Sequence, residues 1–344
     1  MAFFELRDGR RIGDYEKPYI VAEMNSSHNG KIELAEQMID VAVECGCDAV
    51  KFQSWSPDSL YSDGFYKENP MAKRMVQKFS LSEDALFHLA EYCERKGIDF
   101  SSTPYSEREV DFLVDKCKAK FIKIASMELN NPLFLKYIGL KGVPVILSTG
   151  MGTIEEIKKA VKTLKETGND RICILHCVSV YPVGFENVNL RNMMLLKDTF
   201  PYNPVGYSDH TIGFSVACGA SALGAALIEK HFTLDNSRIG WDNQMATEPE
   251  TMKALVDGCN DVFMSMGKYD RELSELEKNQ QIKMRRSLVA SRTIKAGELI
   301  SEEDIYSKRP GTGISPDRYT EIIGKRVNRD LDKDDMFLWE YLDD

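Results

Sequence analysis

The sequence predicts an eight-stranded parallel α/β barrel, (β/α)8, followed by a small C-terminal domain. Eight short apolar runs recur between residues 19 and 232, and most are separated by stretches with the periodicity of amphipathic helices. Repeated strand–helix units form either a closed barrel or a doubly wound sheet. The turn after the first run, Asn25–Gly30, lacks the GxGxxG pattern of a dinucleotide-binding sheet. The barrel is therefore the predicted fold class.

The elements of the barrel follow from these runs. The predicted strands are Tyr19–Met24, Ala49–Ser54, Asp99–Pro104, Phe121–Ser126, Pro144–Thr149, Ile172–Cys177, Pro204–Asp209 and Leu227–Phe232. Between them, apolar residues three and four positions apart predict helices that bury one face. Ser106 with Glu109, and Thr153 with Glu156, have the spacing of a capping box at a helix start.

The segments on either side of the barrel have a different character. Residues 3–14, with a turn at Asp8-Gly9, predict a β-hairpin that plugs the barrel floor. We expect the catalytic domain to span residues 1–267 and a charged helical linker to span 268–286. Residues 287–344, with short strand-like runs and turns, predict a second domain of mainly β or mixed character.

Composition excludes several classes of partner. The net charge of −10 and the pI of about 5.2, without a Lys/Arg-rich run, argue against nucleic acid and anionic membranes. The eight cysteines form no CxxC pair, which favours reduced, buried thiols. The N-terminus resembles neither a signal nor a transit peptide, and no apolar run is long enough to cross a membrane. We therefore expect a cytoplasmic enzyme.

Polar side chains gather where the predicted strands end, which is where functional groups of a barrel lie. Lys51 and Lys123 each stand inside an apolar strand, where a charge is costly unless an ion of opposite sign meets it. An internal ion pair, such as Lys51 with Glu23, is one interpretation. The other is a receptor for phosphate and carboxylate, in which hydroxyl groups at the same level supplement the lysines. These hydroxyl groups belong to Thr103, Ser126 and Ser148.

Two histidines form a second constellation. His210 and His231 end neighbouring strands, so their imidazoles can converge over the barrel mouth and bind a divalent ion such as Mn²⁺. Asp209 and Asp242 lie near them in the sequence. The alternative is that each histidine only forms a hydrogen bond within the core. Glu128, after the fourth strand, is either a general acid or base or a solvated loop carboxylate.

Nine segments in register carry a family resemblance. They are AEMNSSHNG, DAVKFQ, SSTPY, KIASME, PVILSTGM, LHCVSVYP, GYSDHTIG, IEKHF and KRPGTGI. In this order they resemble the N-acetylneuraminate (sialic acid) synthase family, also called nonulosonate synthases. The likeness spans nearly the whole chain. Its last segment implies that residues 287–344 resemble the antifreeze-like (SAF, β-clip type) domain of this family.

The resemblance implies a reaction and a set of site residues. Phosphoenolpyruvate would add through C3 to the aldehyde of an open-chain N-acylated mannose-type sugar, giving a nine-carbon 2-keto acid and phosphate. The residues implied to hold phosphoenolpyruvate are Lys51, Thr103, Lys123, Ser126, Ser148 and Ser208. His210 and His231 would bind the metal, Mn²⁺ with Mg²⁺ or Co²⁺ as alternatives, and Glu23 and Glu128 would handle protons and water.

The family also implies contacts to the sugar. Gln53, Tyr181 and Asp242 would meet it, and Arg309 would come from the partner subunit of a domain-swapped homodimer. Two departures from the family pattern bear on the choice of acceptor. Ser179, also assigned to the substrate site, replaces a common asparagine, and Trp241 stands where a proline is usual, which indicates a more apolar acceptor pocket.

The acceptor therefore stays open between N-acetylmannosamine and diacetamido-trideoxyhexoses. A second hypothesis is a related synthase that uses a phosphorylated sugar, which needs another basic cluster. Such a cluster could come from Lys67, Lys73, Arg74 and Lys78. A third is a catalytically silent carbohydrate-binding protein, which predicts a barrel mouth without its charged groups.

Overall fold

The computed structural model describes residues 1–6 and 8–343 and divides the chain into two compact units. The first unit is Met1–Gly267 and the second is Lys268–Asp344. Within the described residues, no helix combines the length and the apolar character that crossing a bilayer requires.

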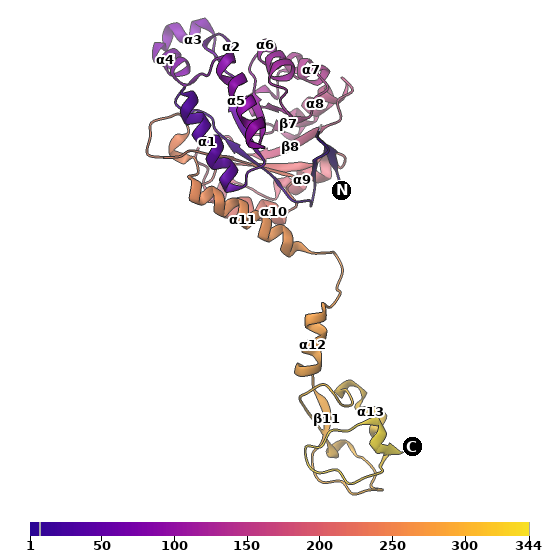
Figure 1. Cartoon of the computed structure of the whole chain (residues 1–344). Coiled ribbons are helices and arrows are strands. Elements are labelled where there is room, and N and C mark those ends of the chain that lie inside the picture. Colours follow the sequence, from indigo (N-terminus) through magenta and orange to yellow (C-terminus); the bar gives the residue numbers. More distant parts are fainter. Residues whose placement is uncertain (7, 344) are drawn as a thin grey trace. The chain divides into compact units, whose positions relative to one another are not determined.

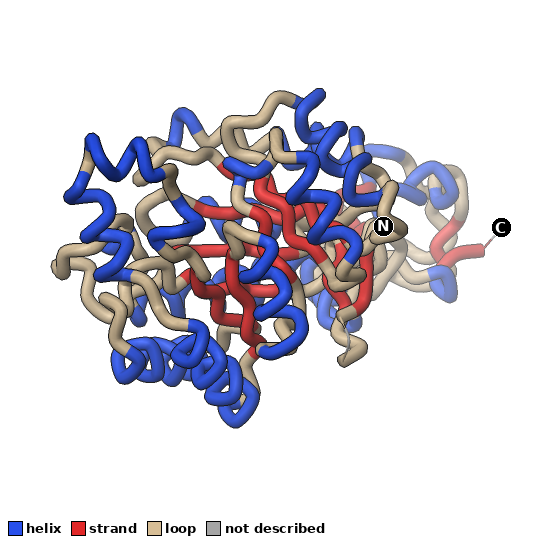
Figure 2. Tube along the Cα trace, turned by 90° about the horizontal axis from the view of Figure 1, so that it is seen from above, coloured by secondary structure: helices blue, strands red, loops and turns tan. Residues whose placement is uncertain are grey.

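The first unit is a closed barrel of eight parallel strands surrounded by helices (Figures 1 and 2). Its strands are β3 (Tyr19–Glu23), β4 (Ala49–Gln53), β5 (Asp99–Thr103), β6 (Ile122–Ile124), β7 (Val145–Ser148), β8 (Ile172–Cys177), β9 (Val205–Asp209) and β10 (Leu227–His231). They follow one another in chain order around the barrel, which β10 closes by pairing with β3. The predicted fold class is confirmed, and all eight predicted strands are present with ends within two residues of the prediction.

Helices cover the outside of the barrel. They include α1 (Ile32–Cys45), α5 (Glu83–Lys96), α7 (Pro132–Leu140), α8 (Ile154–Lys165), α9 (Asn192–Thr199), α10 (Ser215–Ala222) and α11 (Pro249–Met266). Their apolar faces pack on the outward-pointing strand residues, as Met38 of α1 does in the main core. The capping box predicted at Thr153 and Glu156 is confirmed at the start of α8.

The other predicted capping box forms only in part. Ser106 accepts a hydrogen bond from the Glu109 N–H at the start of α6 (Glu107–Asp111). The carboxylate of Glu109 bonds most closely to the Tyr105 N–H, at 2.6 Å. The cap formed by the Ser106 side chain is therefore confirmed, and the carboxylate is shared with the N–H one residue earlier.

The barrel interior changes from apolar to polar along its axis. At the base, inward residues such as Tyr19, Ala49 and Leu227 form a cluster with Phe4 and Ile12. Phe4 and Ile12 belong to the hairpin of β1 (Phe3–Glu5) and β2 (Arg11–Gly13), so the predicted floor plug is confirmed. Because side chains alternate along a strand, the next inward positions toward the carboxyl ends are polar. The base therefore provides apolar packing, and the mouth carries the chemistry.

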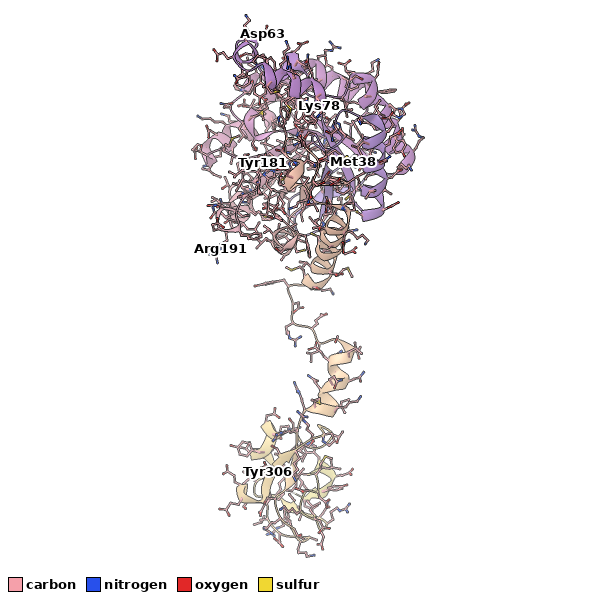
Figure 3. The ribbon with its side chains drawn as sticks, turned by 90° about the vertical axis from the view of Figure 1, so that its left-hand side faces the viewer. Met38, Asp63, Lys78, Tyr181, Arg191 and Tyr306 are labelled. Carbon is pink, nitrogen blue, oxygen red and sulfur yellow. The ribbon has the colours of Figure 1, made fainter. Side chains whose placement is uncertain are left out.

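Three short helices follow β4 and form an excursion above the barrel. They are α2 (Pro57–Leu60), α3 (Asp63–Glu68) and α4 (Pro70–Phe79). Trp55, Tyr66, Val76 and Phe79 give this excursion a small core of its own. Asp63, at the start of α3, lies at the outer tip of the first unit (Figure 3).

The second unit begins with α12 (Glu275–Met284), which has a capping box formed by Ser274 and Glu277. Two antiparallel pairs follow, β11 (Ser287–Ala290) with β12 (Ile305–Lys308) and β13 (Arg326–Val327) with β14 (Leu342–Asp343). The short helix α13 (Tyr319–Ile322) lies between them in the sequence. The core of this unit consists of Leu288, Ala290, Ile294, Ile300, Ile314, Ile322, Val327, Leu331 and Phe337.

Candidate active site at the mouth of the barrel

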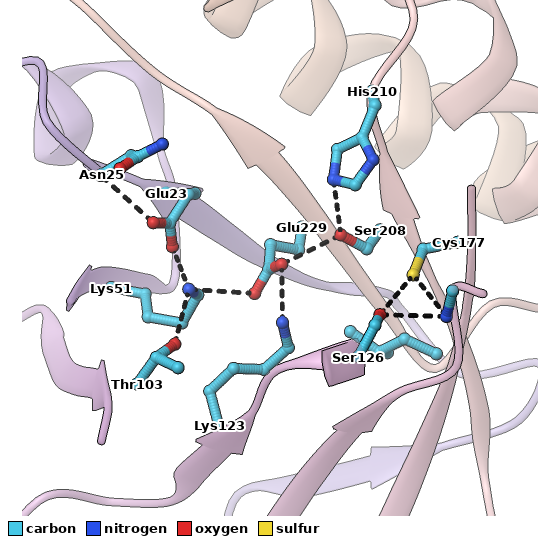
Figure 4. Close-up of polar contacts among 12 residues, drawn as sticks. Glu23, Asn25, Lys51, Thr103, Lys123, Ser126, Cys177, Ser208, His210 and Glu229 are labelled. Carbon is cyan, nitrogen blue, oxygen red and sulfur yellow. Dashed lines mark hydrogen bonds and ion pairs between the residues drawn. The ribbon is translucent and has the colours of Figure 1, made fainter. Parts of the chain in front are cut away.

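A cavity of about 400 Å³ opens at the carboxyl ends of the barrel strands. Most side chains predicted for the site line it. They are Glu23, Lys51, Gln53, Thr103, Lys123, Ser126, Ser148, Ser179, Tyr181, Ser208, His210, His231 and Asp242. The strands bring them together although they span more than 200 positions of the sequence. Figure 4 shows the polar contacts that join several of them.

Lys51 lies on β4 and is 2% exposed, so its ammonium group needs partners within the protein. It donates to Thr103 Oγ1 at 3.0 Å and forms an ion pair with Glu23 on the neighbouring strand. Glu229 Oε2 lies 3.8 Å away. Burial acts to lower the pKa of Lys51, but Glu229 and Glu23 together raise it, so the lysine stays charged. The internal pair that the sequence left open for Lys51 is therefore formed.

Lys123 has the same kind of partner. Its Nζ donates to Glu229 Oε1 at 3.0 Å, and Ser208 Oγ donates to the same oxygen at 2.9 Å. Burial acts to raise the pKa of Glu229, but Lys123, Lys51 and Ser208 outweigh it and lower the pKa. Glu229 thus bridges both lysines as a carboxylate. It was not among the predicted site residues, although its place two positions before His231 puts it on the same inward face.

Glu23 is the more readily protonated of the two glutamates. Its Oε1 accepts from the Asn25 N–H at 3.1 Å and from Gln53 Nε2 at 3.0 Å. Burial raises the pKa of Glu23, Lys51 lowers it, and the nearby charge of Glu229 raises it again, with a net increase. A buried carboxyl with a raised pKa beside cationic groups is suited to accept and return a proton.

Hydroxyl groups and a thiol form the opposite wall. Ser126 lies in the turn Ser126–Glu128, and its Oγ accepts from the Gly150 N–H at 2.9 Å. Cys177 Sγ lies 3.3 Å from Ser126 Oγ and 3.1 Å from the same N–H. A Cβ at position 150 would lie 2.2 Å from Ser179 Oγ, so a larger residue there would displace the side chains of this wall. The wall therefore presents several directional hydrogen-bonding groups to the cavity.

The two histidines stand beside this wall, with ring centroids 5.4 Å apart. His210 Nδ1 bonds to the Val178 carbonyl at 2.7 Å, which makes Nδ1 the protonated nitrogen and leaves Nε2 as an acceptor, 3.4 Å from Ser208 Oγ. Burial lowers the pKa of both rings, and for His231 the neighbouring His210 lowers it further. Both imidazoles are thus neutral near pH 7, the form that binds metal ions.

The lone pairs of the two histidines decide whether they fit the divalent ion that the family resemblance implies. His231 Nδ1 is buried and has no hydrogen-bond partner. His210 Nε2 keeps its lone pair, because the one hydrogen of the nearby Ser208 hydroxyl is donated to Glu229 Oε1. Across residues 1–6 and 8–343, no group of three or more His, Cys, Asp or Glu side chains has the geometry of a metal site. Two neutral imidazoles fit a borderline divalent ion, for which His210 and His231 would be the protein ligands.

Aromatic residues line the outer part of the cavity. The rings of Trp55 and Trp241 lie 5.0 Å apart in an edge-to-face arrangement, and Trp241 also approaches Phe79 of α4. Asp242, next to Trp241, accepts a hydrogen bond from Asn25 Nδ2. Tyr181 lies 4.2 Å from the His210 ring, measured between centroids. One carboxylate and several aromatic faces are thus available to a ligand above the lysines.

Three residues considered at the sequence level lie elsewhere. Glu128 is half-buried but does not line the cavity, and its Oε2 accepts from Asn131 Nδ2 at 2.8 Å. Arg309 is an exposed residue of the second unit. Asp209 points away from the mouth and pairs with the buried Lys230 at 2.8 Å, so it is no partner of the two histidines. Period-two alternation places it there, one position before His210.

A barrel with buried lysines, glutamates and imidazoles at its carboxyl-terminal mouth has the fold and the site of a barrel enzyme. Residues 38–271 match the NeuB family, and residues 285–343 match the SAF domain. The chain therefore belongs to the NeuB family. Several of its relatives are named as synthases, and the chain is an enzyme of the transferase class.

Individual relatives agree over almost the full length. The N,N'-diacetyllegionaminic acid synthase of Legionella pneumophila is 37% identical over 338 residues, which cover 94% of each chain. The enzyme of the same name from Campylobacter jejuni is 38% identical over 93% of this chain and 99% of its own. The crystal structure of N-acetylneuraminic acid (sialic acid) synthetase from Leptospira borgpetersenii in complex with citrate has a TM-score of 0.74 and 30% identity, covering 81% of this chain and 96% of that one.

Proposed function

We propose that the protein condenses phosphoenolpyruvate with an N-acylated mannose-type amino sugar, giving a nine-carbon 2-keto acid and phosphate. The observation that carries the proposal is that one cavity brings Lys51, Lys123 and several hydroxyl groups next to two neutral imidazoles. Phosphoenolpyruvate bears a phosphate and a carboxylate, so it suits a cavity with two ammonium groups and directional donors. An aldehyde acceptor suits the neighbouring imidazoles, which can hold a Lewis acid.

An anionic ligand that enters the cavity must compete with the ion pairs that the two lysines already form. Two lysines there face two carboxylates, Glu23 and Glu229. An incoming dianion has to share the ammonium groups with these carboxylates or displace them. The exchange is favourable only if the ligand replaces each lost contact, because a buried charge without a partner is strongly destabilising. We infer that Thr103 and Ser208, which already contact Lys51 and Glu229, supply part of this replacement.

The residues of the chain then divide the chemistry. Lys51 and Lys123 hold the anionic groups while positive charge develops at C2 of phosphoenolpyruvate. Glu23, with its raised pKa, moves the proton of the water that attacks C2. We keep Glu128 as a second candidate for this step. A divalent ion held by His210 and His231, Mn²⁺ in our proposal, would polarise the aldehyde oxygen as a Lewis acid.

We further propose a diacetamido-trideoxyhexose as the acceptor. Trp55 and Trp241 give the outer cavity an apolar wall that suits a deoxygenated sugar carbon. Two relatives at 37–38% identity are named as N,N'-diacetyllegionaminic acid synthases. A phosphorylated acceptor would need another cation, and in the described part of the chain the only Lys or Arg side chains lining this cavity are Lys51 and Lys123.

Arg309 completes the proposal. It follows β12 in a segment fixed by Ser287, whose Oγ donates to the Pro310 carbonyl at 2.6 Å and accepts from the Gly313 N–H at 2.8 Å. A guanidinium group on a fixed segment is suited to a carbonyl oxygen such as that of an N-acyl group. We propose that the partner subunit of a domain-swapped homodimer delivers this arginine to the acceptor.

The test uses purified protein, phosphoenolpyruvate and a panel of amino sugars, with Mn²⁺ or with a chelator. We expect phosphate release only when an acylated amino sugar is present, faster with the diacetamido-trideoxyhexose than with N-acetylmannosamine. Phosphoenolpyruvate labelled with ¹⁸O at the C2–O–P bridge should yield labelled phosphate, because water attacks C2 and the C–O bond breaks. No release with any acceptor would refute the synthase, and a preference for a phosphorylated sugar would refute the acceptor.

A further inference from the structure

A chain of hydrogen bonds crosses the ends of three neighbouring strands. Tyr105, two residues after β5, donates its hydroxyl to Gln53 Oε1. Gln53, the last residue of β4, donates from Nε2 to Glu23 Oε1 at 3.0 Å. Glu23 is the last residue of β3 and also pairs with Lys51. All four side chains line the cavity.

The chemistry of the groups fixes the direction of this chain. A carboxylate only accepts hydrogen bonds, so the amide of Gln53 must turn its nitrogen toward Glu23. The amide oxygen then faces Tyr105, whose hydroxyl must act as the donor. Burial, and after it the negative charge of Glu23, raise the pKa of Tyr105 well above its ordinary value. The phenol therefore keeps the proton that this arrangement requires.

We propose that Tyr105 is a positioning residue, which holds the Gln53 amide with its nitrogen toward Glu23. The inference rests on the proposed function, since Glu23 is the proton-handling group there. Tyr105 is suited to this part because it is itself held in place. Its ring packs against Trp55, with centroids 6.1 Å apart, and its backbone N–H is bound by Glu109.

The arrangement has a second consequence for the acceptor. The amide nitrogen carries two hydrogens, and Glu23 Oε1 takes one of them. The second hydrogen is available to an oxygen atom of a bound sugar. As long as Glu23 is a carboxylate it also favours this orientation, but once Glu23 takes up a proton its O–H can donate, and without the Tyr105 hydroxyl the amide could turn its oxygen toward it. The turned amide would offer the sugar an acceptor in place of a donor.

The test is a double-mutant cycle on Tyr105→Phe and Gln53→Met, measured as phosphate release with saturating phosphoenolpyruvate and the acceptor that the wild type uses best. Tyr105→Phe should lower kcat about tenfold. This is the factor expected when the transition state loses about the free energy of one hydrogen bond because a catalytic group is misplaced. In the Gln53→Met background, the same substitution should change kcat less than twofold, because the amide through which Tyr105 acts is gone. Equal losses in both backgrounds would show that Tyr105 acts directly and would overturn the proposal.

A second readout does not depend on catalysis. In ¹⁵N–¹H spectra of the full-length protein, Gln53→Met identifies the side-chain amide signal of Gln53. Tyr105→Phe should shift this signal while the melting temperature stays within a few degrees of the wild type. An unchanged signal would overturn the proposal even if no acceptor supports turnover. If the wild type releases no phosphate but Tyr105→Phe still shifts the Gln53 signal, the result would count against the proposed function and not against the positioning role of Tyr105.

Discussion

Replacing Glu229 by glutamine tests the charge balance at the base of the cavity. The carboxylate of Glu229 lies 3.0 Å from Lys123, 2.9 Å from Ser208 Oγ and 3.8 Å from Lys51. An amide of the same shape keeps an acceptor oxygen but removes the negative charge between two buried ammonium groups. Removing one partner of a buried ion pair destabilises a protein by about 3–5 kcal/mol. We expect the lower end, about 3 kcal/mol, because the amide oxygen can still accept from Lys123.

This loss should be visible in thermal unfolding. For a domain of this size, about 3 kcal/mol corresponds to a decrease of roughly 5–10 °C in the apparent melting temperature. Inorganic phosphate or phosphoenolpyruvate should restore part of the loss, since either anion supplies the missing negative charge. The rise in melting temperature on adding phosphate should therefore be larger for Glu229→Gln than for the wild type.

The matched control is Asp14→Asn at the opposite end of the barrel. Asp14 is also a buried carboxylate that pairs with a lysine, Lys197, and it accepts from the Val205 N–H at 2.9 Å. This substitution should lower the melting temperature as well, but phosphate should give it no extra stabilisation. A Glu229→Gln protein as stable as the wild type, or an equal phosphate effect in both variants, would refute the reasoning.

Four further predictions concern other parts of the account. His210→Ala and His231→Ala should each abolish Mn²⁺-stimulated phosphate release while circular dichroism stays unchanged; activity that persists at equal Mn²⁺ would count against the metal site. Lys51→Ala should raise the half-saturating concentration of phosphoenolpyruvate about tenfold or more, and an unchanged value would contradict its role. Arg309→Ala should raise the KM for the acceptor but not for phosphoenolpyruvate, and full activity would refute the subunit-delivered arginine. Burial lowers the pKa of His28, in the turn after β3, from 6.5 to about 4, so the free energy of unfolding is unaffected by this residue above pH 6.5 and decreases as the pH falls toward 4. In urea titrations, the free energy of unfolding of His28→Gln should therefore depend less on pH between 6.5 and 4 than that of the wild type. Equal pH dependence of the two proteins would contradict this prediction.

Much of the barrel was predictable because local sequence patterns determine it. Apolar runs such as Ile172–Cys177 are buried on both sides in a parallel barrel, and this is the pattern that such strands show. Alternation along each strand then placed Lys51, Gln53 and His231 on the inward face. These residues lie at the mouth because the carboxyl ends of all eight strands meet there.

The interactions between distant residues were not predictable in the same way. Glu229 bridges Lys51 and Lys123, which lie on two other strands, and no local pattern indicates which carboxylate a buried lysine will meet. The contact of Glu128 with Asn131 is local, three positions along the chain, but it depends on the conformation of the turn between β6 and α7, which the sequence pattern does not specify. The hydroxyl of Tyr105 was missed because its partner, Gln53, comes from a neighbouring strand.

The measurement that tests the central claim most directly follows both products in one reaction. The purified protein is incubated with phosphoenolpyruvate, Mn²⁺ and an acylated mannose-type amino sugar. Phosphate is assayed, and the sugar product is identified and quantified by mass spectrometry. We predict a nine-carbon 2-keto acid and phosphate in equal amounts, both absent in Lys123→Met. Phosphate without the keto acid, or neither product with any acylated amino sugar, would contradict carbon–carbon bond formation at this cavity.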